Sequence, residues 1–439
     1  MSLNLKDKLS MAPTPARVSS LANGLSGSAI LKIAYEVRDL VARGADVLNL
    51  TVGDFDSHEF PVPTKLADEI KAAVDQGHTN YPPSNGVQSL REAVAEFYAQ
   101  RLDVTVPVES VLVAGGSRPL IAGVYLALVD PKDRVVYGTP SWNNHYYCTL
   151  VGAHGDEIST DAEHRFFPTV EAITPRLAEA RLVCLNSPQN PTGTVIPKDT
   201  LRAVAEAIVE ENRKRAATNK RPVYLMYDQV YWMLTFDGAR HETPVSLVPE
   251  VAPYTVLIDG ISKNFAGTGV RVGWAVGPTD VIARMNALST HLGSWAPKPE
   301  QVATAKLLRD REAVDTYLDA MRTAIHSRLA WLNTAITELG ALGHPVQAIA
   351  PEGAIYLSMR IDLRGRKTPD GQVLETDEDV RGFLLRNAGI ALVPFGCFGV
   401  AKDSGWFRAS VGAVSEAGCR TFKARLEQAL QSLSLAPTL

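Results

Sequence analysis

Short apolar segments alternate with amphipathic segments through roughly the first two thirds of this 439-residue chain. Apolar residues recur at helical spacing over 30–41, 63–76, 88–102, 117–128, 141–152 and 199–215. Short, fully apolar runs that read as buried strands cover 47–50, 111–113, 134–137, 182–185, 223–227, 255–258 and 272–276. Apolar strands separated by helices predict a mostly parallel sheet covered on both faces, which is an α/β fold.

The pattern changes in the C-terminal third. Helical spacing covers 278–292, 299–308 and about 310–339, and strands at 354–359, 390–393 and 406–411 then mix with helices at 377–388 and 415–433. A polar stretch at 362–375 predicts an exposed loop, and residues 1–27, rich in Pro and Gly, predict an irregular arm. We therefore expect an N-terminal arm with part of a small domain (1–59), a large domain (60–305) and a C-terminal small α+β domain (306–439).

Composition and charge exclude several classes of protein. The chain is 46% hydrophobic and 21% charged with a net charge of -4, which is typical of a soluble globular protein and does not indicate a nucleic-acid or membrane partner. No apolar stretch reaches the roughly 20 residues that span a bilayer. The first residues lack the apolar core of a signal peptide, and the four cysteines show no Cys-x-x-Cys spacing. We expect a cytoplasmic protein.

A lysine and an arginine lie eight residues apart between two apolar runs. Lys263 follows the run at 255–258, and Arg271 opens the next one. Gly267 and Gly269 between them predict a tight turn, so both cations are expected on a Gly-rich loop. A lysine amine can form a Schiff base with an aldehyde cofactor, and an arginine can hold its phosphate. Most lysines are solvated, so this loop alone does not establish a site.

Other candidate residues follow the ends of predicted strands. They are a Gly115-Gly116-Ser117 turn that opens a helix, Trp142, Asn190, and the pair Asp228 and Tyr231. Each has a structural alternative: a close-packed turn, a core tryptophan or, for Asp228, the N-cap of a helix. Because ligands of parallel sheets bind at the carboxyl ends of the strands, their common position favours one site. Together they supply what a phosphorylated pyridine aldehyde needs.

The chain resembles the fold-type I pyridoxal-phosphate (PLP) aminotransferases, class I/II of the aspartate aminotransferase superfamily. The resemblance runs from about residue 30 to the C-terminus. It is carried by Asn186-x-x-x-Asn190-Pro-Thr-Gly193, then Asp228-x-x-Tyr231, then Ser262-Lys263 with Arg271 eight residues later. It implies PLP fold type I: a large domain with a mostly parallel sheet between helices, plus a smaller α+β domain.

The resemblance also implies roles for the residues around the cofactor. Lys263 forms the internal aldimine with PLP and later moves the proton between the substrate Cα and C4′ of the cofactor. Asp228 keeps the pyridine nitrogen protonated, Asn190 and Tyr231 hydrogen-bond the ring oxygen, and Trp142 stacks on the ring. The residues assigned to the phosphate are Gly115, Gly116, Ser117 and Arg271.

On the substrate side, the resemblance assigns the α-carboxylate to Arg408, with help from the backbone of Gly53 and from Asn190. Tyr81 corresponds to a tyrosine that reaches the phosphate of the neighbouring subunit, which implies a homodimer with shared active sites. Taken alone, Arg408 would read as an ordinary surface arginine.

The sequence departs from the family pattern beside the cofactor and the substrate. Gly260 stands where many members have a hydroxyl residue, and Ser262 or Ser117 is expected to replace it. Gly53-Asp-Phe-Asp56 replaces the usual Gly-x-Pro-Asp, and Pro394-Phe395 replaces Pro-Gly. These changes bear on the substrate and not on the cofactor.

A further departure concerns the arginine that binds a distal carboxylate in aspartate-specific members. The corresponding stretch, 290–300, contains no arginine. Lys298 and His291 are the cationic alternatives there, and neither is assigned the role.

The sequence therefore predicts a PLP-dependent aminotransferase that moves the amino group of an L-amino acid to a 2-oxo acid, with 2-oxoglutarate as the expected acceptor and no metal. Two alternatives remain. A β-eliminating C–S lyase on the same fold shares these cofactor residues, and a PLP-binding sensor would retain them without catalysis. A sensor of the DNA-binding kind is disfavoured, because about 27 residues before the first predicted helix are too few for a helix-turn-helix.

Overall fold

The computed structural model describes residues 17–25, 27, 29–401 and 403–435, together with residues 5 and 9. Most of the irregular arm predicted over 1–27 lies outside the described residues. Its described part contains a short helix, α2 (Ser20–Gly24), whose Ala22 amide donates to Ser19 Oγ at 3.2 Å. This part of the arm is therefore not irregular. Within the described ranges, none of the helices combines the length and the apolar character needed to cross a bilayer.

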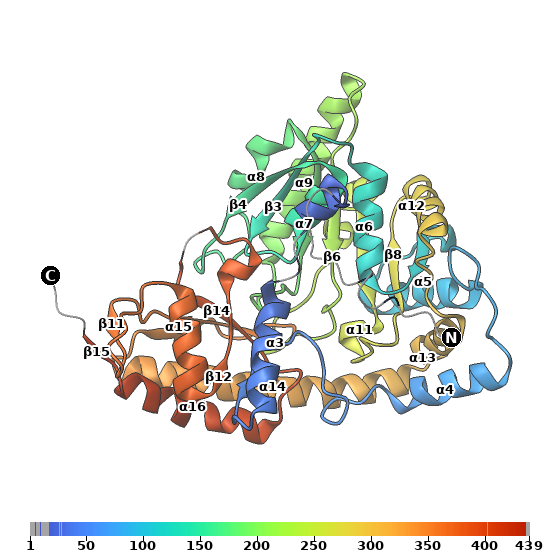
Figure 1. Ribbon diagram of the computed structural model, residues 1–439. Helices are drawn as coiled ribbons and strands as arrows, with labels where there is room; N and C mark the ends of the chain where they lie inside the picture. Colours follow the sequence, from blue (N-terminus) through green and yellow to red (C-terminus); the bar gives the residue numbers. More distant parts are fainter. Residues whose placement is uncertain are drawn as a thin grey trace.

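The centre of the molecule is a seven-stranded sheet in the order β2-β8-β7-β6-β5-β3-β4 (Figure 1). Strand β8 is antiparallel to both neighbours, and every other adjacent pair is parallel. The predicted mostly parallel sheet is thereby confirmed. The strands are β2 (Val111–Ala114), β3 (Arg134–Thr139), β4 (His154–Ser159), β5 (Ala180–Asn186), β6 (Tyr224–Asp228), β7 (Thr255–Gly260) and β8 (Gly273–Val276).

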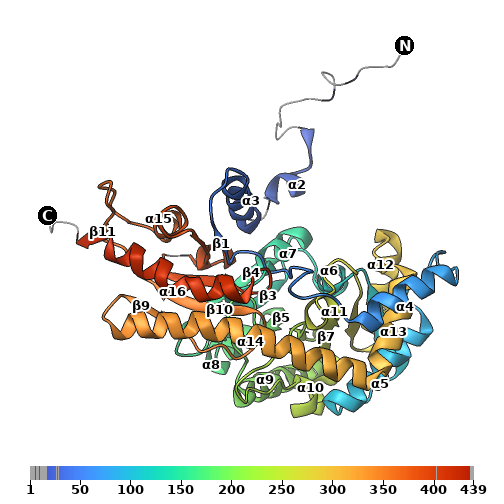
Figure 2. The same cartoon turned by 90° about the horizontal axis from the view of Figure 1, so that it is seen from below.

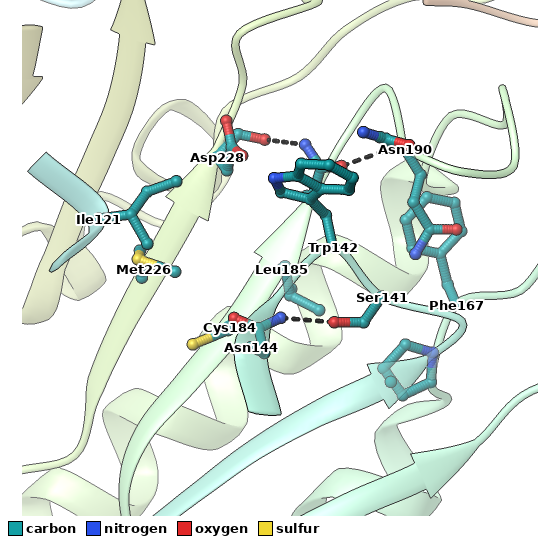
Figure 3. A pocket seen from close by; sticks show the side chains of 14 residues that line it. Ile121, Ser141, Trp142, Asn144, Phe167, Cys184, Leu185, Asn190, Met226 and Asp228 are labelled. Carbon is teal, nitrogen blue, oxygen red and sulfur yellow. Dashed lines mark hydrogen bonds between the residues drawn. The ribbon is translucent and has the colours of Figure 1, made fainter. Parts of the chain in front are cut away.

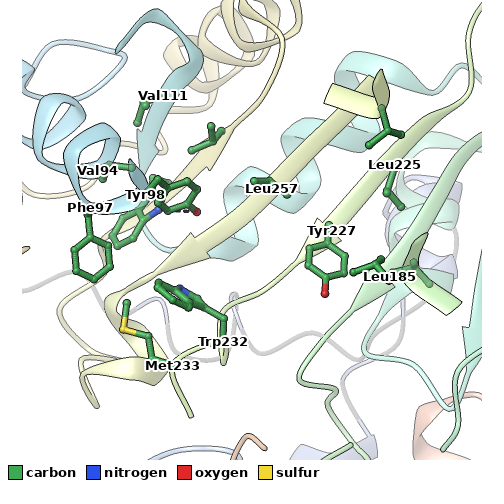
Figure 4. Close-up of a cluster of buried hydrophobic side chains, with 14 of the residues drawn as sticks. Val94, Phe97, Tyr98, Val111, Leu185, Leu225, Tyr227, Trp232, Met233 and Leu257 are labelled. Carbon is green, nitrogen blue, oxygen red and sulfur yellow. Dashed lines mark hydrogen bonds between the residues drawn. The ribbon is translucent and has the colours of Figure 1, made fainter. Parts of the chain in front are cut away.

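Helices cover both faces of this sheet, because alternate residues of each strand point to opposite sides. In β6, Leu225 and Tyr227 belong to one core, whereas Tyr224 and Met226 belong to the other. Figure 4 shows part of the first core, in which Val94, Phe97 and Tyr98 of α5 meet the sheet. The helices of the first face are α5 (Gln88–Leu102), α8 (Val170–Leu177), α9 (Lys198–Ala217) and α13 (Lys298–Arg309), and those of the second are α6 (Ser117–Leu128), α7 (Asn144–Val151) and α12 (Thr279–Leu292).

Several elements of this domain escaped the sequence prediction, and the edge strand is the most instructive. Strand β4 has the sequence His-Gly-Asp-Glu-Ile-Ser and lies at the edge of the sheet, where only Ile158 is buried. An edge strand needs no continuous apolar run, so the criterion for buried strands missed it. Helix α8 was also omitted.

The C-terminal third forms a second, antiparallel sheet in the order β13-β14-β10-β9. The long helix α14 (Arg311–Ala341) runs along the molecule beside α16 (Glu416–Gln431), as Figure 2 shows. The stretch 362–375, predicted as a loop, contains the two-residue strand β11 (Arg366–Lys367), which pairs with β15 (Ser434–Leu435). The remaining elements are β9 (Val346–Ala348), β10 (Tyr356–Ile361), α15 (Asp377–Phe383), β13 (Val393–Pro394) and β14 (Trp406–Ser410).

The N-terminal segment returns to this C-terminal part. Strand β1 (Leu48–Asn49) pairs in parallel with β12 (Ile390–Ala391). Helix α3 (Ala29–Ala42) buries Ile33 and Val37 in a cluster with aromatic side chains of the C-terminal part. We keep the divisions after residues 59 and 305 as proposed domain boundaries.

Candidate active site

The carboxyl ends of three neighbouring strands meet at one cavity. Trp142 follows β3, Asn186 ends β5 and leads to Asn190, and Asp228 ends β6. Figure 3 shows these side chains with Ile121 of α6, which closes another side of the cavity.

Asp228 faces the cavity with few partners. Among the described residues, the Val230 amide is the only hydrogen-bond donor to its carboxylate, at 3.2 Å. Burial raises the pKa of Asp228 to about 7, while this amide and Lys263 lower it. No helix begins here, so the N-cap interpretation is wrong. A partly buried carboxylate with unused acceptor sites is suited to a cationic partner in the cavity.

Lys263 does not lie on a Gly-rich loop, as the sequence had suggested, but on the one-turn helix α11 (Ile261–Asn264). The left-handed backbone positions that follow are Ala266 and Arg271, with φ of 48° and 63°, whereas Gly267 and Gly269 do not have positive φ. The turn therefore forms without using the conformational freedom of either glycine.

The pKa of the Lys263 amine is lowered toward neutral pH. Nζ donates to the carbonyl oxygen of Gly53 at 2.7 Å. Burial lowers the pKa of Lys263 to about 8; Asp54 opposes this effect, and nearby arginines, including Arg408 and Arg118, add to it. A lysine with a lowered pKa is available as a nucleophile and as a base.

The backbone amides that the turn before α6 offers to an anion differ from those predicted. The amides of Gly115 and Gly116 already donate to Ser294 O (2.8 Å) and Ala114 O (2.7 Å). The amides without intrahelical partners are those of Ser117 and Arg118 in the first turn of α6, where the helix dipole is positive.

Arg271 completes this end of the site. Its guanidinium donates to Thr268 O and Gly115 O, both at 2.8 Å. A Cβ on Gly116, where φ is 95°, would collide with that guanidinium. The structural role of Gly116 is thus to let the arginine approach the start of α6.

The departure at Gly260 also has a steric reason. A Cβ there would lie 2.8 Å from both Gly273 Cα and Val272 O. The backbone of β8 therefore excludes any side chain at this position, hydroxyl or otherwise. Ser262, mostly buried beside Lys263 on α11, and Ser117 are the hydroxyl residues at hand.

Arg408 of β14 is 1% exposed, so the surface interpretation is wrong. Its Nη1 donates to Asn190 Oδ1 at 3.1 Å and its Nη2 to Thr51 O at 2.6 Å, whereas Nε has no partner. No described carboxylate pairs with this guanidinium, and burial lowers its pKa. A buried cation without a counter-ion is costly, and it is suited to an anionic ligand.

The structure adds Tyr356 to the predicted residues. Its hydroxyl lies 2.6 Å from that of Tyr231, and the Arg408 guanidinium lies 4.8 Å from the centroid of its ring. A Cβ on Gly53 would be 2.8 Å from the Tyr356 hydroxyl, so this tyrosine also explains the glycine. Tyr356 lies in an apolar strand that reads as core, and no motif in the sequence marks it.

Three predicted or considered residues lie away from these contacts. Tyr81 is 82% exposed, with its ring 5.5 Å from that of Trp295. Lys298 donates to Asn80 Oδ1 at 2.6 Å, next to Tyr81, and His291 is exposed in the last turn of α12.

Comparisons with known proteins agree on one family. The family model described as Aminotransferase class I and II matches residues 45–426. The chain is 31% identical over 395 residues to an aspartate/prephenate aminotransferase of Thermus thermophilus, covering 88% of this chain and 94% of the relative. It is 29% identical over 442 residues to an aspartate aminotransferase of Rhizobium meliloti, covering 99% and 100%.

Solved structures give the same result. The aspartate aminotransferase from Thermus thermophilus with maleate superposes with a TM-score of 0.82 at 28% identity, over 94% of this chain and 99% of that one. The Rhizobium meliloti enzyme superposes with a TM-score of 0.85 at 26% identity, over 95% and 99%.

Proposed function

This chain belongs to the class I and II aminotransferase family, and from that premise we propose that it moves the amino group of L-aspartate to 2-oxoglutarate. The protein is a PLP-dependent aminotransferase, and our proposal concerns the identity of its amino-group donor and acceptor. Its relatives are named for aspartate, and one related structure is described with maleate, a dicarboxylate. The observation that carries the proposal is the buried guanidinium of Arg408, which lacks a counter-ion and suits the carboxylate of an amino acid.

The residues of the cavity fit PLP. The cofactor has an aldehyde, a pyridine nitrogen and a phosphate. Lys263 offers an amine of lowered pKa, Asp228 a carboxylate with a single donor, and the start of α6 with Arg271 a positive site for the phosphate. We assign the flanks of the ring to Trp142, whose side chain lines the cavity.

The bound cofactor supplies an electron sink that lets the Cα–H bond of the substrate break. The chain supplies the rest. Asp228 holds a proton at the ring nitrogen, and Asn190 and Tyr231 hydrogen-bond the ring oxygen. Arg408 and the Gly53 backbone orient the α-carboxylate. With the cofactor bound, Lys263 would take the proton from the substrate Cα and return it at C4′ of the cofactor.

We extend the proposal to a cytoplasmic homodimer. The exposed ring of Tyr81 is available to reach the phosphate site of a second subunit, as the sequence predicted. The four cysteines are free, in keeping with a reducing compartment.

An absorbance titration of the purified holoenzyme tests the proposal. Aspartate should shift the band of the bound cofactor, and 2-oxoglutarate should restore it with formation of glutamate. Release of pyruvate, ammonia and sulfide from L-cysteine, with the original band retained, would identify β-elimination instead. Failure to bind PLP at all would overturn the assignment.

Lys263→Ala is the matched variant for this titration. It removes the amine that moves the proton, so turnover should fall by at least about 10⁴-fold while the protein stays folded by circular dichroism. A fully active variant would remove Lys263 from the mechanism.

A further inference from the structure

One arginine at this cavity has no role in the account so far. Arg118 is the second residue of α6 and precedes Ile121 by three positions. Residues three apart lie on the same face of a helix, and Ile121 lines the cavity. The guanidinium carbon of Arg118 lies 5.3 Å from the centroid of the ring of Trp142, which also lines the cavity.

The charge of Arg118 affects the pKa of two side chains, Lys263 and Tyr147. It adds to the burial that lowers the pKa of Lys263. On the other side, burial raises the pKa of Tyr147 to about 12, and Arg118 opposes that rise. The charge of Arg118 therefore acts on Lys263 of α11 and on Tyr147 of α7.

Arg118 also has no ion-pair partner. Among the described residues, no carboxylate lies within ion-pair distance of it, and its guanidinium makes no hydrogen bond to them. An exposed arginine without a partner is ordinary, so this absence alone indicates nothing. Its position over Trp142, a residue that lines the cavity, is what distinguishes it.

We propose that Arg118 binds the second carboxylate of a dicarboxylic substrate and so selects aspartate and 2-oxoglutarate over monocarboxylic acids. The inference rests on the proposed function, which places the α-carboxylate at Arg408. A second carboxylate needs another cation. Lys298 is bonded to Asn80, and His291 is exposed at the end of α12, so the stretch 290–300 supplies no free cation at the cavity.

The chemistry of the side chain suits this role. A guanidinium binds a carboxylate through two parallel N–H···O bonds. The cation–π contact with the Trp142 ring restricts the position of the guanidinium before the ligand arrives. The phosphate of the cofactor is a second anion of the kind that a guanidinium binds. We assign Arg118 to the substrate because Arg271 and the first turn of α6 already provide for the phosphate.

The test uses the Arg118→Gln and Arg118→Lys holoenzymes, with Arg284→Gln, an exposed arginine of α12, as the control. For Arg118→Gln, the ratio of kcat/KM for aspartate to that for alanine should fall by roughly 10- to 150-fold, mainly through the KM for aspartate. The Kd of succinate, an unreactive dicarboxylate, should rise by a similar factor, and that of propionate much less. Arg118→Lys should recover part of the loss, and Arg284→Gln should match the wild type.

Three results would overturn the inference. An unchanged aspartate-to-alanine ratio with unchanged succinate affinity would remove Arg118 from substrate binding. Weaker PLP binding in equilibrium dialysis, with equal losses for both amino acids, would assign it to the phosphate. An equal loss of succinate and propionate affinity would make its effect unspecific. If the wild-type enzyme does not use aspartate, the proposed function fails separately, and succinate binding still decides the role of Arg118.

Discussion

Two carboxylates lie at or near the ends of neighbouring strands of the central sheet, yet their surroundings differ: Asp259 is fully buried, whereas Asp228 is only partly buried. Asp228 ends β6, and Asp259 lies one residue before the end of β7, which runs parallel to β6. Burial raises the pKa of both, to about 7 for Asp228 and about 8 for Asp259. Asp259 accepts hydrogen bonds from Gly260 N (2.7 Å), Trp232 Nε1 (2.8 Å) and Tyr98 OH (3.2 Å). Asp228 accepts only from the Val230 amide among the described residues.

The alternation of side chains along each strand accounts for this difference. Asp259 shares the face of Leu257 and points into the core of Figure 4, where Tyr98 and Trp232 meet it. Asp228 shares the opposite face with Met226 and opens onto the cavity of Figure 3. Burial alone therefore does not identify a functional acid. The unused acceptor sites and the open side of Asp228 do, because they leave room for a cation.

The largest expected difference between the two acids is in activity. Asp228→Asn keeps the shape but removes the charge that holds the proton of the ring nitrogen, so kcat/KM for aspartate should fall by about 10²- to 10⁴-fold. Steady-state kinetics of the reconstituted variant measure this. The matched Asp259→Asn variant should lose far less. Equal losses in the two variants would contradict the contrast.

A second pair of variants extends the contrast to buried arginines. Arg408 has an unpaired Nε, whereas Arg328 donates through Nε to Val414 O, through Nη1 to Ala324 O and through Nη2 to Glu59. Arg408→Ala should raise the KM for aspartate by about 10²- to 10³-fold, because it removes the partner of the α-carboxylate.

Arg328→Ala should instead act on stability. Breaking its pair with Glu59 should lower the free energy of unfolding by up to about 3 kcal/mol in urea titrations, since Glu59 is partly exposed. A large rise in KM for this variant, without a loss of stability, would show that the number of hydrogen-bonded guanidinium nitrogens does not distinguish a substrate-binding arginine from a structural one.

Where motifs follow strand ends, the sequence predicted which side chains the structure brings together. Parallel strands place their carboxyl ends at one edge, so Trp142, Asn190 and Asp228 converge without any knowledge of contacts. The predicted sheet and most helices were recovered for a similar reason, because each buries an apolar face of regular period.

The sequence did not predict contacts between segments that lie far apart along the chain. Tyr356 lies 125 residues from the tyrosine whose hydroxyl it meets, and Tyr98 lies 161 residues from Asp259. No local pattern marks either pair. Edge strand β4 was missed because it is exposed and polar, and Gly116 was given a binding role although its neighbour Arg271 requires it for steric reasons.

A smaller effect is expected from Asp259→Asn on stability. The asparagine retains one acceptor, but its Nδ2 faces the donors Trp232 Nε1 and Tyr98 OH, so at least one buried polar group loses its partner. The free energy of unfolding should fall by about 1 to 3 kcal/mol. Chemical denaturation of the cofactor-free protein measures this fall. A variant as stable as the wild type would show that the network around Asp259 is not structural.

The pH dependence of stability also distinguishes the two acids. A carboxyl group whose pKa is raised on folding binds more protons in the folded state. Its stabilising contribution is complete below its unfolded pKa, near 3.9, and is lost as pH rises through about 7 for Asp228 and about 8 for Asp259. In the cofactor-free protein, each Asn variant should therefore flatten the fall in stability over that window by at most about 1.4 kcal/mol per pH unit. Once PLP is bound, the carboxylate of Asp228 pairs with the protonated ring nitrogen. The contribution of Asp228 to the pH dependence of stability should then disappear, whereas that of Asp259, which faces the core, should persist. Urea titrations between pH 5 and 9, with and without PLP, measure both slopes. Loss of both on adding PLP would mean that the two acids titrate as one site.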